Sequence, residues 1–184
     1  MSNKCGSLVV ISGPSGVGKG TICQQLLADG DFVFSVSATT RKMRNGEENG
    51  VHYHFLAVED FKKRIENDEF LEWAKVYDNY YGTLKSAVLE KLEVGQNVLL
   101  DIDTNGAKQV KSKMPEAVLV FLMPPSVEEL EARLRGRATD SDEVIKKRLS
   151  CFEYELEQRQ YYDHIVVNDV VERAVTEIKE ILNK

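Results

Sequence analysis

The 184-residue sequence predicts an α/β fold in which helices cover both faces of a parallel sheet and a smaller block of strands is inserted. Three observations lead to this prediction. A short apolar segment, residues 8–11, is followed by a glycine-rich loop and then by apolar residues at helical spacing. From residue 84 onward, apolar strand-like segments alternate with amphipathic helical ones, as in parallel sheets. Between these parts, residues 34–82 contain short, aromatic-rich strand patterns.

The glycine-rich loop, SGPSGVGKGT at residues 12–21, matches the pattern of a phosphate-binding loop. Such a loop directs successive backbone N–H groups into one concavity at the positive end of a helix dipole. Lys19 would then reach the β- and γ-phosphates of a nucleotide. The pattern normally has Ser or Thr directly after the lysine to hold Mg²⁺, whereas here Gly20 stands there and Thr21 follows. The alternative interpretation is a glycine-rich turn with a surface lysine.

The inserted block begins after the first helix and ends near residue 83. A polar stretch, residues 39–50, separates its first two strand patterns. The expected elements are a strand over 32–38, a strand over 51–55, a short helix over 60–67 and a strand over 70–77. These strands follow one another without long crossovers, so we expect an antiparallel arrangement.

Alternation of helices and strands resumes at residue 84. Three apolar strands are expected, at 97–100, 117–123 and 165–167. The helices expected before and between them begin at Leu84, at Ala107, after Ser126 and after Asp142; Gly95 ends the first and Pro115 the second. A last helix is expected from Val171 to Leu182.

Composition narrows the class of function. A hydrophobic content of 42% suffices for a core, and the net charge of 24 − 30 = −6 argues against a general nucleic-acid or anionic-membrane binder. Three cysteines without C-x-x-C spacing indicate reduced thiols. No segment approaches 18 apolar residues, and residues 1–7 do not resemble a signal peptide. We therefore expect a soluble cytoplasmic protein, and its oligomeric state stays open.

Several residues could carry chemistry. Asp101 ends a buried strand, where P-loop enzymes place the acidic residue that organises Mg²⁺; the alternative is an aspartate that caps the next turn. The stretch 39–54 holds two arginines and a tyrosine suited to phosphate, although solvated charged loops are common. Four arginines in the C-terminal half could neutralise a transferring phosphoryl group or could simply favour a helix C-terminus. They are Arg133, Arg135, Arg137 and Arg148.

Six stretches resemble those of the guanylate kinases, which are nucleoside monophosphate kinases of the P-loop class. They are GPSGVGKGT (13–21), SVSATTRKMRNGEENGVHYHF (35–55), FLEWAKVYDNYYGT (70–83), LLDIDTNG (99–106), PPSVEELEARLRGRATDSDEVIKKRL (124–149) and VVND (166–169). The resemblance runs essentially end to end, and the middle stretches are specific because they belong to the acceptor subdomain. It implies a core over 1–33 and 84–184, a GMP-binding insertion over about 34–83 and a lid over about 135–150.

The resemblance also implies which residues bind the two nucleotides. The residues implied for ATP are Gly13, Pro14, Ser15, Gly16, Val17, Gly18, Lys19, Gly20, Thr21, Arg133, Arg137 and Asn168. The residues implied for GMP are Ser37, Arg41, Arg44, Tyr53, Glu72, Tyr81, Thr83 and Asp103. The residues implied for catalysis are Lys19, Arg41, Arg44, Arg137 and Arg148. Asp101 is the expected contact for Mg²⁺.

The activity implied is transfer of the γ-phosphoryl group of ATP to GMP. Two other interpretations stay open: a P-loop kinase for another small acceptor, and a related binding module that recognises a phosphorylated protein without catalysis. Glu72 with Asp103 argues for guanine, and the intact loop up to Lys19 argues for catalysis. We expect hinge closure around the nucleotides, with hinges near Ser35, Gly82 and Ala138.

Overall fold

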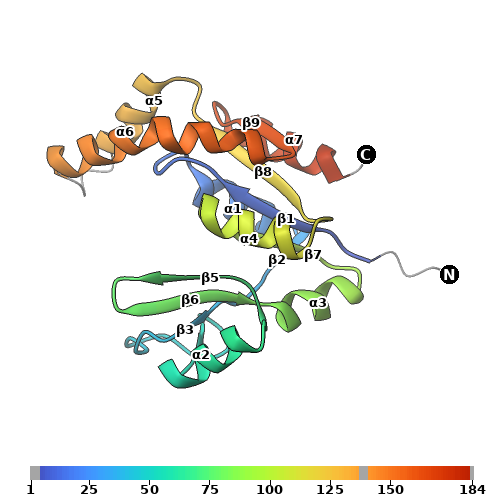
Figure 1. Ribbon diagram of the computed structural model, residues 1–184. Helices are drawn as coiled ribbons and strands as arrows, with labels where there is room; N and C mark the ends of the chain where they lie inside the picture. Colours follow the sequence, from blue (N-terminus) through green and yellow to red (C-terminus); the bar gives the residue numbers. More distant parts are fainter. Residues whose placement is uncertain (1–4, 137–140, 183–184) are drawn as a thin grey trace.

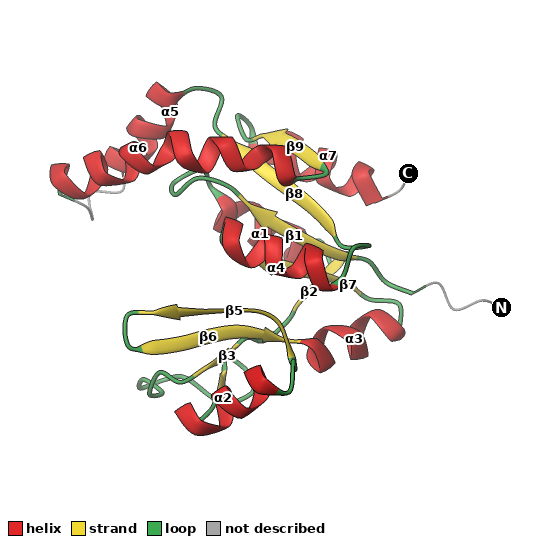
Figure 2. Cartoon of the chain, viewed as in Figure 1, coloured by secondary structure: helices red, strands yellow, loops and turns green. Residues whose placement is uncertain are grey.

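The computed structural model describes residues 5–136 and 141–182 of the chain. These residues form two sheets, a larger one of five strands and a smaller one of four. In Figure 1 the larger sheet and its helices form the upper body, and the smaller sheet lies below it together with α2 (Val58–Glu66). Figure 2 shows α3 (Lys85–Glu93) leading from the lower part back toward the upper one. The predicted α/β fold with an inserted block of strands is confirmed.

The larger sheet is parallel throughout, as the alternation of strands and helices predicts. Its strands, in spatial order, are β2 (Phe32–Phe34), β7 (Asn97–Asp101), β1 (Leu8–Ser12), β8 (Val118–Met123) and β9 (His164–Val167). The central strand, β1, is buried along its whole length. Because side chains alternate along a strand, Val9 and Ile11 face one hydrophobic core and Val10 faces the other.

Helices cover both faces of this sheet. They are α1 (Lys19–Ala28) and α7 (Val171–Leu182) on the first face, and α3 with α4 (Thr104–Lys113) on the second. Ile22 and Ile178 pack with Val9, whereas Val88 and Val110 pack with Val10.

The remaining helices, α5 (Val127–Gly136) and α6 (Asp142–Glu157), form a separate pair. They pack on each other through Leu130, Leu134, Ile145 and Phe152 and project as an arm at the upper left of Figure 1. A 3₁₀ turn, η1 (Gln158–Tyr161), connects α6 to β9. None of the helices in the described ranges is long and apolar enough to cross a membrane.

The smaller sheet differs from the predicted antiparallel block. Its strands, in spatial order, are β4 (His54–Phe55), β3 (Ala38–Thr39), β6 (Asn79–Leu84) and β5 (Phe70–Val76). The β5–β6 and β3–β6 pairs are antiparallel, but β3 and β4 run parallel. The connection between β3 and β4 reverses the chain twice, which a polarity pattern does not reveal.

One expected strand is divided in the structure, and one observed strand was not expected as a separate element. The strand expected over 32–38 is two short strands in different sheets, because the chain leaves the core sheet at Ser35 and enters the smaller sheet at Ala38. The sequence did not separate β6 from the strand before it. A turn at Tyr77, whose φ is 53°, folds β5 and β6 into a hairpin.

Candidate functional site

The phosphate-binding loop connects β1 to α1 and requires glycine at two positions. Gly13 has φ 147°, and a Cβ there would lie 2.3 Å from the carbonyl oxygen of Leu122. Gly18 has φ 99° and immediately precedes α1; a Cβ there would lie 2.5 Å from Nδ2 of Asn168. Any side chain at either position would displace the loop, so the glycines hold its backbone against β8 and the β9–α7 connection.

Lys19 curves back over the loop. Its Nζ donates to the carbonyl oxygens of Gly13 at 2.7 Å and Pro14 at 3.3 Å. Burial lowers the pKa of Lys19, and the Asp101 carboxylate acts in the opposite direction. The ammonium group is therefore held at the mouth of the loop, where the phosphate groups of a nucleotide lie in such loops.

Helix α6 lies across the loop and contacts it twice at Ser15. The Arg148 guanidinium donates to Ser15 Oγ at 3.2 Å. The carboxylate of Glu155 accepts a hydrogen bond from the Ser15 backbone N–H, and burial raises the pKa of this carboxyl. Glu155 was not predicted from the sequence, although it lies seven residues after Arg148 and so on the same helix face.

The other side of the loop is held by the residue after β9. Asn168 is buried, and its Nδ2 donates to the Val17 carbonyl at 2.8 Å. Arg133 of α5 donates to the Asn168 carbonyl at 2.9 Å. A pocket of about 290 Å³ opens here, and its lining residues are Gly16, Gly18, Thr21, Arg133, Asn168, Asp169 and Val171. Arg133 and Asn168 thus support the loop and border the adjoining pocket.

The end of β7 forms the floor of a second pocket of about 290 Å³. Asp101 lies at this strand end and is exposed to solvent on one side. Partial burial raises the pKa of its carboxyl, and the nearby Lys19 ammonium acts to lower it. Ser35 and Ser37 line the same pocket. The Ser35 hydroxyl is buried and has no hydrogen-bond partner among the described residues.

The polar stretch between β3 and β4 holds Arg41 in a defined position. Its guanidinium forms a two-pronged ion pair with Glu47, at 2.7 and 3.0 Å, and lies 5.5 Å from the centre of the Tyr53 ring. It also donates to the Tyr81 hydroxyl. Glu47 further accepts from the Arg44 backbone N–H at 2.7 Å, and these hydrogen bonds lower the pKa of Glu47 to about 2.

The structure therefore brings three of the four residues implied for the acceptor phosphate into contact. Tyr53 and Tyr81 lie edge to face, with ring centres 6.1 Å apart, and Arg41 joins both. The Arg44 side chain is exposed beside them. Glu47 was not identified from the sequence, because a glutamate in a charged loop resembles many others.

A second acidic group lies where β5, β6 and α4 meet. Glu72 is only 7% exposed, and its Oε1 accepts from the Thr83 hydroxyl at 2.7 Å. Asp103 caps the N-terminus of α4 by accepting from the Gly106 N–H at 2.8 Å. A Cβ at Gly106 would lie 3.2 Å from Glu72 Oε2 and 3.5 Å from Asp103 Oδ1. The two carboxylates thus flank one point, and burial together with Asp103 raises the pKa of Glu72, against the hydrogen bond from Thr83.

This acidic group is electrostatically linked to the phosphate-binding loop. Burial lowers the pKa of Lys19 and the Asp103 carboxylate acts in the opposite direction, so the carboxylate that caps α4 and the loop lysine lie in one region of the molecule. Ser37, Tyr53, Thr83 and Asp101 line the pocket between the strand ends and the smaller sheet.

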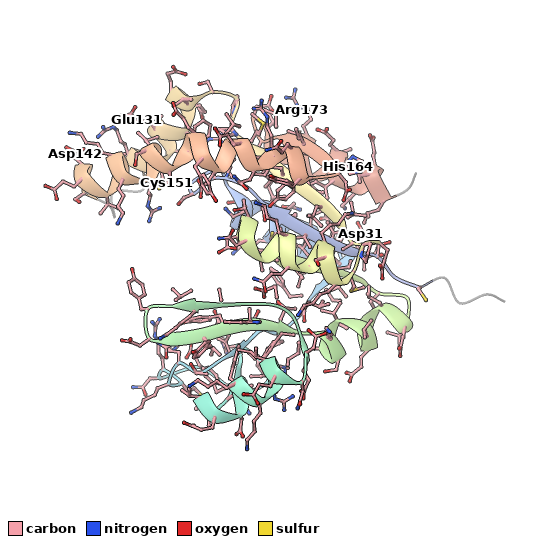
Figure 3. The ribbon with its side chains drawn as sticks, viewed as in Figure 1. Asp31, Glu131, Asp142, Cys151, His164 and Arg173 are labelled. Atoms are coloured by element: carbon pink, nitrogen blue, oxygen red, sulfur yellow. The ribbon has the colours of Figure 1, made fainter. Side chains whose placement is uncertain are left out.

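The arm formed by α5 and α6 carries the remaining arginines. Arg135 forms ion pairs with Glu131 at 2.8 Å and with Asp142 at 2.5 Å, and so joins the two helices (Figure 3, where both acidic residues are labelled). Arg137, implied for ATP and catalysis, lies outside the described residues, as does Ala138.

Known proteins are similar to this chain over nearly its whole length. The guanylate kinase family profile matches residues 6–184. The chain is 52% identical to the guanylate kinase of Carboxydothermus hydrogenoformans over 178 residues, 96% of this chain and 87% of that protein. The crystal structure of guanylate kinase from Anaplasma phagocytophilum superimposes with a TM-score of 0.72 at 33% identity, covering 100% of this chain and 87% of that one.

A more distant structure shares the fold alone. Shikimate kinase from Bacteroides thetaiotaomicron superimposes with a TM-score of 0.51 at 15% identity, covering 97% of this chain and 99% of that one. The profile match and the 52% identity confirm the resemblance seen in the sequence. The chain belongs to the guanylate kinase family.

Proposed function

We propose that this chain transfers the γ-phosphoryl group of ATP to GMP, giving ADP and GDP, at the site where the phosphate-binding loop meets the smaller sheet. Membership of the guanylate kinase family supports the reaction. In our proposal the core with its loop binds ATP, and residues 34–83 bind GMP.

The observation that carries the choice of acceptor is the pair of carboxylates around Gly106. Guanine presents N1–H and the N2 amino group as adjacent donors and O6 as an acceptor. The Glu72 carboxylate can accept from both donors, and a nearby hydroxyl such as that of Ser37 can donate to O6. Adenine reverses this pattern, so a buried carboxylate facing it would be left poorly paired at a cost of about 1–3 kcal/mol.

The acceptor phosphate is assigned to Arg41 and the residues around it, Arg44, Tyr53 and Tyr81. A guanidinium suits phosphate oxygens because it donates from a rigid planar fork. Glu47 and the Tyr53 ring orient Arg41 before a ligand arrives, and Tyr81 and the exposed Arg44 add further donors. This arrangement suits a monophosphate that must be presented in one orientation.

The chemical step needs positioning and charge neutralisation and no side-chain base. The second pKa of a phosphate monoester is near 6, so a GMP oxygen is largely deprotonated at neutral pH. That oxygen attacks the γ-phosphorus while the bond to the β–γ bridging oxygen breaks, and ADP leaves with the electron pair. Lys19, which contacts the Gly13 carbonyl, and Arg148, which contacts Ser15, both lie at the loop and would neutralise the charge of the phosphoryl group in transfer.

The residues at the end of β7 are compatible with Mg²⁺, which favours oxygen ligands and keeps several waters. The Asp101 carboxylate and the unpartnered hydroxyl of Ser35 line one pocket. At Gly20, where a hydroxyl is usual, no described atom lies within 4 Å of the position that a Cβ would take, and Thr21 lines the other pocket. In our proposal Asp101 holds the ion, which neutralises charge on the nucleotide phosphates when bound.

The place of action proposed is the cytoplasm. Cys5, Cys23 and Cys151 are free thiols in the described chain, and burial raises the pKa of Cys23 to about 12. Free thiols are compatible with a reducing compartment.

Release of ADP from ATP, measured with each of GMP, AMP, CMP, UMP and a small non-nucleotide acceptor, tests the proposal. We expect rapid release of ADP with GMP and with none of the other acceptors. If another acceptor gave equal or faster release of ADP, that compound would take the place of GMP as the assigned acceptor. Binding of GMP without any release of ADP would favour a non-catalytic binding module.

A further inference from the structure

We propose that Gln109, on α4, is a positioning residue that sets the place of Glu72 and thereby the selectivity for guanine. The inference rests on the proposed function, because it takes Glu72 as the guanine contact. Gln109 is not among the residues that the resemblance implies for either nucleotide.

Gln109 completes the outer edge of the smaller sheet. β5 is the edge strand of that sheet, and α4 lies directly above it in Figure 1. The Trp73 N–H donates to Gln109 Oε1 at 3.2 Å, and Gln109 Nε2 donates to the Trp73 carbonyl at 3.1 Å. The side-chain amide thus pairs with both backbone groups of Trp73, as a residue of a neighbouring strand would.

A second residue of α4 holds the same strand three residues earlier. Lys113 Nζ donates to the Phe70 carbonyl at 2.6 Å and pairs with Asp68 at 2.8 Å. Glu72 therefore lies between two points, Phe70 and Trp73, at which α4 is bonded to the β5 backbone.

The strand needs these contacts because its pairing with β6 is irregular at this place. Phe70 pairs with Leu84, whereas Glu72 pairs with Thr83, so the register shifts between them. Such a bulge redirects a side chain and weakens the local ladder. Bonds from α4 therefore hold the backbone where the β5–β6 ladder alone does not.

The same helix carries the second carboxylate. Asp103 caps α4, and Gly106 in its first turn approaches Glu72 so closely that a Cβ there would lie 3.2 Å from Oε2. Gln109 follows Gly106 by three residues, about one turn of a helix. Asp103, Gly106 and Gln109 thus form one rigid unit, and the Gln109 amide fixes β5 to it, so the separation of the two carboxylates is set by α4.

The test uses Gln109→Met, which keeps the length of the side chain and removes both hydrogen bonds. Ser112→Ala is the matched control, because Ser112 is exposed on the same helix. The first readout is amide hydrogen exchange at Trp73 in the nucleotide-free protein, followed together with the fluorescence of this single tryptophan. We expect exchange at Trp73 to become at least tenfold faster in Gln109→Met and to stay unchanged in Ser112→Ala.

The second readout is steady-state kinetics. We expect Gln109→Met to raise KM for GMP on the order of tenfold, with kcat and KM for ATP within about twofold of the parent chain. The preference for GMP over IMP, which lacks the N2 amino group, should fall as well. A general loss of structure would change ATP and GMP parameters together, so this split separates positioning from folding.

Two results would overturn the proposal: unchanged Trp73 exchange in Gln109→Met, or faster exchange with unchanged KM for GMP and unchanged GMP-to-IMP preference. If Gln109→Met does not fold, Gln109→Glu takes its place. It retains the acceptor for the Trp73 N–H and puts a charged oxygen in place of the donor to the Trp73 carbonyl, so an unchanged preference there also overturns the proposal. Absence of GMP phosphorylation by the parent chain would refute the proposed function instead, and the exchange experiment would still test the bond.

Discussion

Glu72 is a buried carboxylate whose hydrogen bonding is incomplete in the protein without nucleotide. The carboxylate is only 7% exposed, and hydrogen bonds from the hydroxyl and the backbone N–H of Thr83 stabilise its charged form. Burial and the neighbouring Asp103 raise the pKa of Glu72. A buried carboxylate that lacks full pairing destabilises the fold, whereas guanine would supply the missing donors.

The Glu72→Gln variant should lose GMP use far more than ATP use. A glutamine presents one acceptor where two guanine donors need pairing, so we expect kcat/KM for GMP to fall roughly 10–100-fold with KM for ATP within about twofold. Steady-state kinetics against both substrates measures this, with Glu66→Gln on α2 as an exposed control. Unchanged GMP use would refute the guanine assignment.

The same substitution should stabilise the nucleotide-free chain at neutral pH. Because the folded-state pKa of Glu72 is raised, the native state binds more protons than the unfolded state in the range above the ordinary carboxyl value. The contribution of Glu72 to stability therefore falls as pH rises through that range, and the variant removes this loss. Urea unfolding of both proteins measures this. The free energy of unfolding of the variant should exceed that of the parent chain at about pH 7, and this excess should be smaller at about pH 4.

Lys19→Ala should abolish transfer and leave GMP binding nearly intact. Lys19 contacts the loop to which we assign the donor phosphates, so we expect kcat to fall about 10²–10³-fold, a loss typical for removal of one group that stabilises a transition state. Calorimetric titration with GMP should give an affinity within about twofold of the parent, with the exposed Lys62→Ala as the surface control. A GMP affinity that falls as much as kcat would contradict separate donor and acceptor sites.

At the scale of elements, the phosphate-binding loop is held by neighbours that are distant in sequence, whereas the polar stretch after β3 is held by a residue within it. The loop between β1 and α1 is fastened by α6 through Arg148 and by the β9–α7 connection through Asn168. The polar stretch after β3 is organised internally by Glu47, which bonds both Arg41 and the Arg44 backbone. These contacts orient the site before a ligand binds.

Glu47→Gln should weaken GMP binding by removing the ionic partner of Arg41. Ion pairs near the surface contribute modestly, so we expect KM for GMP to rise by no more than about fivefold. Glu48→Gln, on the next residue, is the control. Since the pKa of Glu47 is about 2, this contact should persist in the parent chain down to about pH 3. Equal KM values for both variants and the parent would remove Glu47 from the phosphate site.

For the whole molecule, the smaller sheet joins the core through few connections. The chain passes from β2 to β3 through residues 35–37 and from β6 directly to α3 after Leu84. Gly82, near which a hinge was expected, lies inside β6, where a Cβ would be 2.8 Å from the Glu72 carbonyl. We therefore propose the β6–α3 junction as the turning point on that side, with the α4–β5 contact beside it.

We predict closure of the smaller sheet and of the α5–α6 arm around the nucleotides. An open arrangement admits two substrates, and a closed one excludes water from the phosphoryl group. The radius of gyration in solution scattering should fall on addition of GMP and again with a non-hydrolysable ATP analogue. The same scattering profile with and without both ligands would refute closure.

Local sequence alone determined the elements whose cause is local. The phosphate-binding loop follows from glycine and lysine spacing after an apolar strand, and the parallel sheet follows from alternating strand and helix patterns. The resemblance to the guanylate kinases predicted the family and the candidate site residues. Of these, Arg41, Tyr53 and Tyr81 lie together in the structure. Glu72, Thr83 and Asp103 form a second group.

Tertiary structure decided what depends on packing between distant segments. Gln109 meets Trp73 across 36 residues, and Arg148 meets Ser15 across 133, so neither contact has a local pattern. The parallel pairing of β3 with β4 was likewise missed, because backbone hydrogen bonds between short strands do not depend on side-chain periodicity. Side-chain periodicity identifies the buried face of an element, but only the packed fold determines which polar groups on that face meet and therefore which residues hold the site in place.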